Sequence, residues 1–370
     1  MPKVLHIYKT YFPDPPGGVQ EVIRSICSCT SPYGYSHTVL TVSDIAHPEK
    51  IEFEGVQVYR EKTWFDLFSC PISGPRLFFT MSQLSKKHDI LVYHYPWPFG
   101  DLLSFVSDPK PTVVLYHSDI VKQKLSGICY APLRNVFLAN SDVIVATSKN
   151  YLRSSKILKK YLNKTCVIPL AATPDPQSPN LAILFKHNLM NKPYVLFLGA
   201  LRYYKGLQYL IRAAKKIQVP VIIAGDGGYK NQLEKLKAEC AVKNVIFLGR
   251  VSNAEKKALL MNCSVFVFPS HLRSEAYGVA LAEAAMYGKP MVSCDIGTGT
   301  SYVNVDGITG YVVKPQDSEA LSTAINHILT SPLLSAEMSH QARARWQSYM
   351  SPEVFGISWN KLFFKLLTHG

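Results

Sequence analysis

Residues 265–290 read VFVFPSHLRSEAYGVALAEAAMYGKP, and this stretch decides the fold of the second half of the chain. The apolar run Val265–Phe268 predicts a buried strand. A loop with a proline and a glycine follows, and the small and apolar residues of Val279–Met286 predict a helix that is almost entirely buried. Gly288 and Pro290 end that helix, and residues 291–293 predict a further strand. This order of elements indicates parallel β-α-β structure.

The same stretch carries two glutamates, Glu275 and Glu283, with seven residues between them. An unpaired carboxylate on a buried helix costs several kcal/mol, so Glu283 needs a partner, and the hydroxyl groups of a nucleotide ribose are suitable donors. The free N–H groups at the helix N-terminus, near Gly278, suit a diphosphate. Glu275, on the preceding loop, would then face the sugar of the same ligand.

Short apolar runs alternate with helical patterns along the whole chain, which predicts an α/β fold with two parallel sheets. Four prolines in residues 169–179 indicate a linker. We therefore expect a first Rossmann-like domain over 1–170, a linker over 171–180, a second Rossmann-like domain over 181–345, and a C-terminal helix within 346–370 that packs back on the first domain. The working site is expected in a cleft between the domains, at the carboxyl ends of both sets of strands. The predicted strands are 4–8, 37–42, 90–93, 112–116, 143–147, 166–168, 194–198, 221–224, 245–248, 265–268, 291–293 and 311–313.

Other segments at predicted strand ends are candidate ligand contacts. Arg202 and Lys205 precede a predicted helix over 206–217, where two cations suit a leaving diphosphate, although Arg202 alone also fits an ordinary surface residue. Gly17 and Gly18 follow the first strand, and their backbone N–H groups suit a phosphate.

Two histidines, His94 and His117, terminate predicted strands of the first domain and are expected to point into the cleft, and a structural role is the alternative for a histidine at a strand end. Trp97, close to His94, suits stacking on a sugar or an isoprenoid, and core packing is the alternative.

The motif around the two glutamates resembles that of glycosyltransferase family 4, whose members have the GT-B fold and a Glu-x7-Glu element. The resemblance implies a retaining, metal-independent transfer of a sugar from a nucleotide diphosphate donor. It assigns Glu275 to the sugar hydroxyls, Glu283 to the ribose and Lys205 to the diphosphate. Ala200 stands where the family often has an arginine, and Arg202 is the candidate replacement.

The resemblance extends to further residues. Gly225, Asp226 and Gly227 match a turn near the nucleotide, or form an ordinary tight turn. His117 matches the catalytic histidine of the family. The remaining assignments place Arg250, Val251, Tyr277, Gly278 and Val279 at the donor, and His94, Trp97 and Asp119 at the acceptor.

Residues 117–124 and 297–304 resemble a bacterial subgroup that assembles O-antigen or capsule polysaccharides. This implies GDP-mannose as the donor and a polyprenyl-diphosphate-linked glycan as the acceptor. The alternatives are another nucleotide sugar, a GT-B-fold epimerase that needs no acceptor, and a non-catalytic sensor of nucleotide sugars. No Gly-x-Gly-x-x-Gly opens either half, which disfavours an NAD-binding oxidoreductase.

The composition and charge of the chain limit its possible partners, metals and location. The net charge of +14 suits anionic partners, yet no nucleic-acid-binding motif occurs. Basic residues concentrate in 149–164, interleaved with apolar ones as in an amphipathic helix, which indicates an exposed helix face or contact with anionic lipid. The absence of Asp-x-Asp and of zinc-type cysteine spacing predicts no metal, and no cofactor is expected. No stretch resembles a secretory signal or a membrane span, so we expect a cytoplasmic protein, peripheral on the inner face of the membrane.

Overall fold

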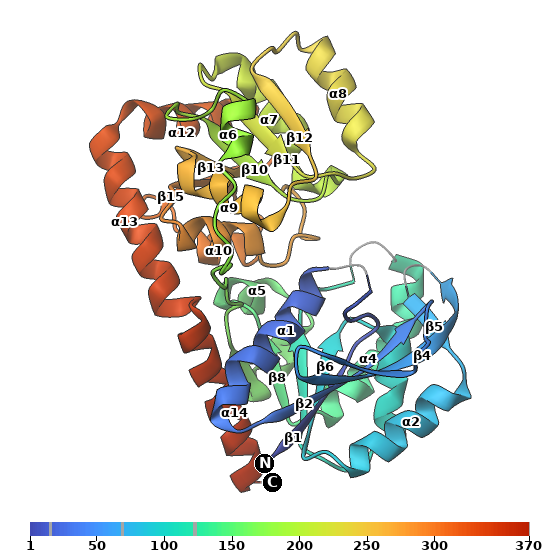
Figure 1. Ribbon diagram of the computed structural model, residues 1–370. Helices are drawn as coiled ribbons and strands as arrows, with labels where there is room; N and C mark the ends of the chain where they lie inside the picture. The colour runs from blue at the N-terminus through green and yellow to red at the C-terminus, as the bar shows by residue number, and fades with distance from the viewer. Residues whose placement is uncertain (15–16, 68–69, 121–123, 370) are drawn as a thin grey trace. The chain divides into compact units, whose positions relative to one another are not determined.

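The computed structural model describes residues 1–14, 17–67, 70–120 and 124–369 (Figure 1). Pro15 and Pro16 of the glycine loop and residues 121–123 of the segment 117–124 lie outside the described residues. The chain divides into two compact units, one formed by Met1–Leu170 with Pro352–Gly370 and the other by Ala171–Ser351. Each unit is built on its own largely parallel sheet with helices, so the predicted α/β class is confirmed.

The sheet of unit 1 has the order β3-β4-β2-β1-β6-β7-β8-β9, with β5 paired to β4. Along this spatial order, from β2 through β1, β6, β7 and β8 to β9, each strand is parallel to its neighbour. The strands β3 and β5 run antiparallel to β4. Its strands are β1 (Lys3–Ile7), β2 (Ser36–Ser43), β3 (Lys50–Phe53), β4 (Val56–Leu67), β5 (Cys70–Ser73), β6 (Ile90–Tyr95), β7 (Thr112–Tyr116), β8 (Val143–Ala146) and β9 (Thr165–Val167).

The helices of unit 1 come from both segments of the chain that form it, Met1–Leu170 and Pro352–Gly370. The C-terminal helix packs beside α1, where the Tyr35 ring lies 5.2 Å from the Phe363 ring and the Tyr35 hydroxyl donates to Asn360 (Figure 1). The α-helices are α1 (Gly18–Thr30), α2 (Pro75–Lys86), α3 (Pro98–Asp101), α4 (Lys124–Asn140), α5 (Lys149–Ser154) and α14 (Pro352–His369). The 3₁₀ turns are η1 (Ser31–Tyr33), η2 (Leu102–Phe105) and η3 (Leu158–Lys164).

Unit 2 contains an all-parallel sheet in the order β12-β11-β10-β13-β14-β15. Its central strands are fully buried, as expected for a parallel sheet covered on both faces. The strands are β10 (Val195–Leu198), β11 (Val221–Ala224), β12 (Val245–Gly249), β13 (Val265–Phe268), β14 (Met291–Cys294) and β15 (Gly310–Val313). The helices are α6 (Ala182–Lys186), α7 (Leu207–Ala213), α8 (Lys230–Glu239), α9 (Asn253–Asn262), α10 (Val279–Met286), α11 (Thr300–Val303), α12 (Ser318–Thr330) and α13 (Pro332–Tyr349), with 3₁₀ turns η4 (Tyr203–Lys205) and η5 (Ala214–Lys216).

Two predicted helices differ from the observed ones. The helix expected over 206–217 is α7 followed by the 3₁₀ turn η5. The basic stretch 149–164 is not one amphipathic helix, because α5 ends at Ser154 and η3 starts only at Leu158. Lys156, Lys159 and Lys160 are nevertheless exposed. In the part of the chain that the structure describes, no helix combines the length and hydropathy needed to cross a bilayer.

Candidate active site

The side chains of Lys205 and Glu275 meet at the carboxyl edge of the unit 2 sheet. Lys205 follows β10 and Glu275 follows β13, so neighbouring strands deliver them to the same edge. Their ammonium and carboxylate groups form an ion pair, and both side chains are largely buried, with 11% and 12% exposed. The Lys205 Nζ atom also lies 4.6 Å from the centre of the Phe268 ring. The sequence had assigned both residues to one ligand, and the structure places them in contact.

The backbone of the two loops fixes this pair. Gly206 has φ of 72°, and a Cβ atom there would overlap the carbonyl oxygen of Pro269. The His271 N–H donates to the Tyr204 carbonyl over 3.0 Å, which ties the same two loops together. Only glycine permits both the left-handed conformation and the close approach, so Gly206 sets the position of Lys205 relative to Glu275.

Glu283 has a protein partner that the sequence did not indicate. Lys256, on α9, donates to its Oε1 atom over 2.7 Å. The helix α10 buries Leu281, Ala282 and Ala284–Met286, whereas Val279, Ala280 and Glu283 remain partly exposed. The expectation of an almost entirely buried helix was therefore wrong for this face, and the pairing of Glu283 does not require a ligand.

The N-terminus of α10 has backbone N–H groups that no side chain caps. Gly278 starts the helix with φ of 86°, and no side chain caps it. The first N–H groups of a helix have no partner within the helix and carry partial positive charge. The Tyr277 side chain is buried against Gly299, so a donor contact from Tyr277 would use its backbone. In the same region, the Arg273 side chain donates to the Gly297 carbonyl over 3.0 Å and so links the loop before α10 to the loop after β14.

The turn at Gly225, Asp226 and Gly227 lies against the loop that leads to Lys205. The Leu201 N–H donates to the Asp226 carbonyl over 2.9 Å, and a Cβ atom on Gly225 would overlap the Gly199 carbonyl. The Asp226 carboxylate accepts from its neighbouring Gly227 N–H, as in an ordinary tight turn.

The two arginines predicted at the donor have exposed side chains. The Arg250 Nε lies 3.8 Å from Asp226 and its side chain is 89% exposed. Arg202 is also exposed, and among the described residues it has no recorded contact with Glu275. Val251, next to Arg250, is half-buried.

In unit 1, four histidines from adjacent strands form a continuous hydrogen-bonded row, called here the histidine row. Its members, in spatial order, are His37 (β2), His6 (β1), His94 (β6) and His117 (after β7). Each neighbouring pair is joined by a nitrogen–nitrogen contact of 3.1 Å, and all four residues are buried. Burial lowers the pKa of every member, to about 4 for His37, to about 3 for His117 and well below the usual value for the other two.

The row corrects the interpretation of His94. Its side chain was expected to point into a cleft and contact the acceptor, but the residue is only 2% exposed. Its Nε2 contacts His6 and its Nδ1 contacts His117, so both ring nitrogens are already occupied.

Trp97 and Asp119 also make internal contacts. Trp97 is 2% exposed and donates through Nε1 to the Pro71 carbonyl over 3.1 Å, so core packing is the correct alternative. The Asp119 Oδ1 accepts from the Tyr116 hydroxyl and from Ser155, over 2.8 and 2.9 Å. Both residues therefore position other parts of unit 1, which argues against direct acceptor contacts.

The glycine loop of unit 1 leads directly into a helix. Gly17 is the N-cap residue of α1, Gly18 is its first residue, and no side chain caps this end. The Gln20 side chain donates to the Thr10 hydroxyl over 2.8 Å, which ties the start of the helix to the loop that follows β1.

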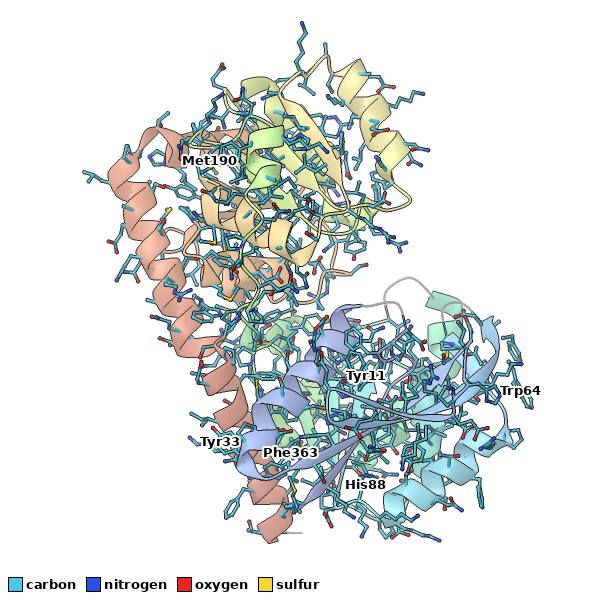
Figure 2. The ribbon with its side chains drawn as sticks, viewed as in Figure 1. Tyr11, Tyr33, Trp64, His88, Met190 and Phe363 are labelled. Carbon is cyan, nitrogen blue, oxygen red and sulfur yellow. The ribbon has the colours of Figure 1, made fainter. Side chains whose placement is uncertain are left out.

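Unit 1 has a pocket of about 690 Å³ that sequence reasoning missed. It lies beside the β4–β5 hairpin, from which Trp64 projects with 63% of its surface exposed (Figure 2). Burial lowers the pKa of Lys9 in its wall. The lining comprises Lys9, Thr10, Asp14, Val42, Ser43, Asp44, Ile45, Thr63, Trp64, Phe65, Asp66 and Pro71. An aromatic ring beside charged and hydroxyl groups suits a sugar.

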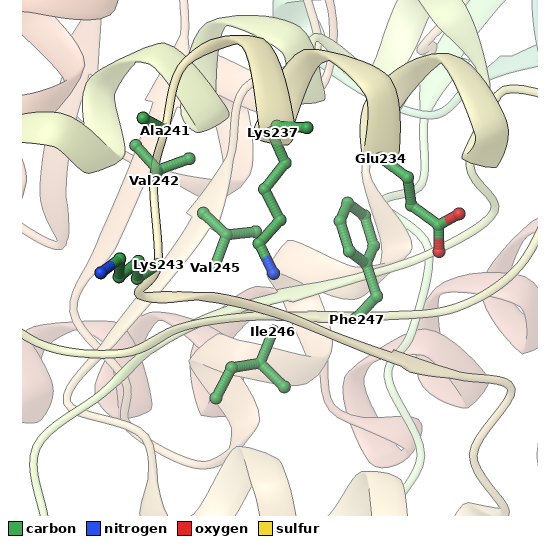
Figure 3. A pocket seen from close by; sticks show the side chains of 9 residues that line it. Glu234, Lys237, Ala241, Val242, Lys243, Val245, Ile246 and Phe247 are labelled. Carbon is green, nitrogen blue, oxygen red and sulfur yellow. The ribbon is translucent and has the colours of Figure 1, made fainter.

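A second pocket, of about 720 Å³, lies between α8 and β12 in unit 2 (Figure 3). Val245 and Phe247 form its apolar floor, and Lys237 and Glu234 stand at its sides. Of the predicted site residues that the structure describes, none lines this pocket, so it is distinct from the Lys205–Glu275 edge.

Comparison with known proteins agrees with this arrangement. Residues 181–345 match the family model described as "Glycosyl transferases group 1", and residues 16–175 match "Glycosyltransferase Family 4". The chain is 40% identical to the D-rhamnosyltransferase WbpZ of Pseudomonas aeruginosa over 93% of this chain and 91% of that protein. It is 38% identical to the O-antigen chain mannosyltransferase C of Escherichia coli, over 99% of both chains.

A solved structure extends the likeness to the fold. The sucrose-phosphate synthase of Thermosynechococcus elongatus superposes with a TM-score of 0.81 over the full length of both chains, at 20% identity. The two curated relatives match at far higher identity and nearly full coverage. The chain therefore belongs to glycosyltransferase family 4 and is a hexosyltransferase with the GT-B fold.

Proposed function

We propose that this enzyme transfers a manno-configured hexose from a GDP-sugar to a polyprenyl-diphosphate-linked glycan in O-antigen assembly, with retention of anomeric configuration. The observation that carries the proposal is the Lys205–Glu275 pair beside the uncapped N-terminus of α10. A cation and a helix N-terminus stabilise the negative charge that develops on a departing diphosphate, so no metal ion is required.

The roles of the unit 2 residues follow from their charges. Lys205 contacts the diphosphate, and Glu275 accepts hydrogen bonds from the sugar hydroxyls. Glu283, which is paired with Lys256, accepts from the ribose hydroxyls. The Gly225–Asp226–Gly227 turn and the backbone at Arg250 and Val251 complete the nucleotide site.

Transfer follows from attack on the anomeric carbon from the side of the leaving group. The bond from the acceptor oxygen to that carbon forms as the carbon–phosphate oxygen bond breaks, and the acceptor proton passes to the leaving phosphate. The transition state resembles an oxocarbenium ion, which the Glu275 carboxylate stabilises. His117 accepts a hydrogen bond from a sugar hydroxyl. The backbone N–H groups of Gly17 and Gly18 donate to a phosphate of the donor.

The choice of sugar is supported by the two relatives, one named for D-rhamnose and one for mannose. D-rhamnose is 6-deoxymannose, so the two sugars differ only at C6. A site that hydrogen-bonds the 6-hydroxyl rejects the deoxy sugar by about 10⁴-fold, whereas an apolar site discriminates by only about 10²-fold. The ratio of activities with GDP-mannose and GDP-D-rhamnose therefore reports the polarity of the C6 pocket.

The acceptor is assigned to the unit 1 pocket beside Trp64. The ring of Trp64 offers a stacking surface for a sugar, and Lys9 offers a cation for the diphosphate of the lipid carrier. The location that fits this acceptor is the cytoplasmic face of the membrane.

The test is an assay of the full chain with a panel of nucleotide sugars, with and without a polyprenyl-diphosphate-linked glycan. We expect transfer from a GDP-sugar only when the acceptor is present, and NMR of the product should show a retained anomeric configuration. Donor turnover to an epimer without acceptor, or an inverted product, would contradict the proposal.

Glu283→Gln is expected to weaken GDP binding by about 10- to 100-fold, because hydrogen bonds to a charged group contribute about 1.5–3 kcal/mol. Isothermal titration calorimetry with GDP measures this change. Lys256→Met is the matched control, since it breaks the same ion pair but leaves the carboxylate for the ribose. If both variants weaken GDP binding equally, the ion pair and not the ribose contact explains the effect.

The basic segment gives a separate prediction. Replacing exposed Lys156, Lys159 and Lys160 by glutamine is expected to lower partitioning onto anionic vesicles by about 100-fold, at about 1 kcal/mol for each charge. Co-sedimentation with phosphatidylglycerol vesicles measures it. The control is the same change at three exposed lysines of unit 2, Lys215, Lys235 and Lys243. Equal losses in both triple variants would mean that only net charge matters.

A further inference from the structure

The histidine row ends on a hydroxyl group whose proton has one possible direction. The Thr30 Oγ1 atom lies 2.7 Å from the carbonyl oxygen of Ile26 and 2.8 Å from Nε2 of His37. Each contact is short enough to require a proton between its two atoms. A carbonyl has no proton to give, so the hydroxyl donates to Ile26. The proton in the other contact therefore belongs to Nε2 of His37.

This assignment propagates along the row. A neutral imidazole carries one N–H donor and one lone-pair acceptor, so protonated Nε2 of His37 leaves its Nδ1 as an acceptor. That Nδ1 faces Nε2 of His6, which must be the donor, and the Nδ1 of His6 then accepts from Nε2 of His94. The Nδ1 of His94 accepts in turn from Nε2 of His117. All four rings have the same tautomer, with the proton on Nε2.

The neutral state of the rings follows from the same geometry. An imidazolium has N–H groups on both sides, so a charged His37, His6 or His94 would direct its Nδ1–H at the Nε2–H of the next ring across a contact of only 3.1 Å. The rings are also buried, which removes the hydration that a charge requires.

We propose that Thr30, His37, His6 and His94 fix the tautomer of His117, so that its Nδ1 presents a lone pair to a sugar hydroxyl of the substrate. The four are positioning residues, because they act through His117. Among the described residues, no partner is recorded for this Nδ1, whereas the row and Thr30 engage every other ring nitrogen in it. The catalytic consequence rests on the proposed function of His117, but the tautomer itself does not.

A bound metal is the competing explanation for part of this cluster. Ligand atoms of His6, His37 and Cys27 lie within 4.8 Å of one another. A metal would need ring nitrogen lone pairs, yet the nitrogens that His6 and His37 turn toward each other are joined by a hydrogen bond. The two explanations differ in a measurable quantity, the metal content of the purified chain.

Thr30→Val provides the test, because valine keeps the shape of threonine but accepts no hydrogen bond. An unsatisfied buried N–H of His37 is then costly, and the row is expected to reverse so that every proton moves to Nδ1. His117 would present an N–H in place of a lone pair. The conservative variant Thr30→Ser retains the hydroxyl and should retain the tautomer.

The measurement is ¹⁵N NMR of histidine side chains in the full-length protein, with the His117 signals assigned by its loss in His117→Asn. We expect protonated Nε2 in the wild type and in Thr30→Ser, and protonated Nδ1 in Thr30→Val. We also expect kcat to fall by about tenfold or more in Thr30→Val, with the donor KM changed less than about twofold, if the hydrogen bond from the sugar hydroxyl to His117 strengthens in the transition state, because losing such a contact lowers turnover more than ground-state binding.

Three results would overturn the proposal: protonated Nδ1 on His117 in the wild type, an unchanged His117 signal in Thr30→Val, or one equivalent of tightly bound metal. A reversed row with unchanged kcat would overturn the positioning role. A wild-type chain that transfers no sugar would instead refute the proposed function, and the NMR measurement would still decide the tautomer.

Discussion

Lys205→Met is expected to lower kcat/KM by about 10³-fold, because removing one electrostatic contact from a developing anion costs about 10²–10³ in rate, and Lys205 carries a full charge. The variant also removes the ion-pair partner of Glu275, whose side chain is only 12% exposed, so some loss of thermal stability is expected. Steady-state kinetics with saturating acceptor and a thermal unfolding curve measure the two effects separately.

A second substitution separates stability from catalysis. The double variant Lys205→Met/Glu275→Gln removes both charges of the pair, so it should recover stability while activity stays low. Arg202→Met is the control for charge alone, because Arg202 is exposed and the sequence allowed it the same role. If Arg202→Met costs as much activity as Lys205→Met, the diphosphate contact belongs to both cations. If Lys205→Met retains activity within tenfold, the proposed site is wrong.

The buried parallel strands could be predicted from sequence because a strand covered on both faces is a continuous apolar run. Thr112–Tyr116, Val221–Ala224 and Val265–Phe268 were predicted with the observed bounds. The strands β3 to β5 were missed, since β3 alternates half-exposed and exposed residues and β4 ends in four exposed ones. The pocket at Trp64 was missed with them, because the β4–β5 hairpin contributes much of its lining.

The direction of side chains and the contacts between residues far apart in sequence were harder to predict from the sequence. The strand-end positions of His94 and His117 were apparent, but strand ends do not reveal whether a ring points along the sheet. The row depends on lateral contacts between β2, β1, β6 and β7, which are far apart in sequence. Lys256 as the partner of Glu283 is non-local in the same sense, because it joins α9 to α10 across 27 positions.

The histidine row also predicts a steep loss of stability in acid. In the unfolded chain each histidine binds a proton below its usual pKa of 6.5, whereas in the folded chain burial keeps the pKa of His37 at about 4 and that of His117 at about 3. The unfolded state therefore binds more protons in this interval, so the free energy of unfolding is highest above pH 6.5 and falls as pH decreases. The pKa values of His6 and His94 are lowered in the same direction by burial.

One buried carboxyl group has the opposite effect on how the free energy of unfolding depends on pH. Burial raises the pKa of Asp101 to about 8, so the folded state binds the extra proton there and gains stability as pH falls from 8 to 4. The histidines with lowered pKa values outnumber this one carboxyl, so the net effect below pH 6.5 is a loss of stability in unit 1 as pH falls.

Urea unfolding followed by circular dichroism between pH 5 and pH 8 measures the slope of stability against pH. His37→Asn retains an acceptor for His6 but cannot bind the proton, so it should lower the slope by about 1.4 kcal/mol per pH unit. The same substitution at the exposed His340 controls for the loss of a histidine as such. A slope that His37→Asn leaves unchanged would mean that His37 is protonated in the folded enzyme as it is in the unfolded chain. The tautomer assigned to His117 would then be wrong as well. A charged ring donates from both of its nitrogens, so the hydrogen bonds of the row could not all run in the assigned direction.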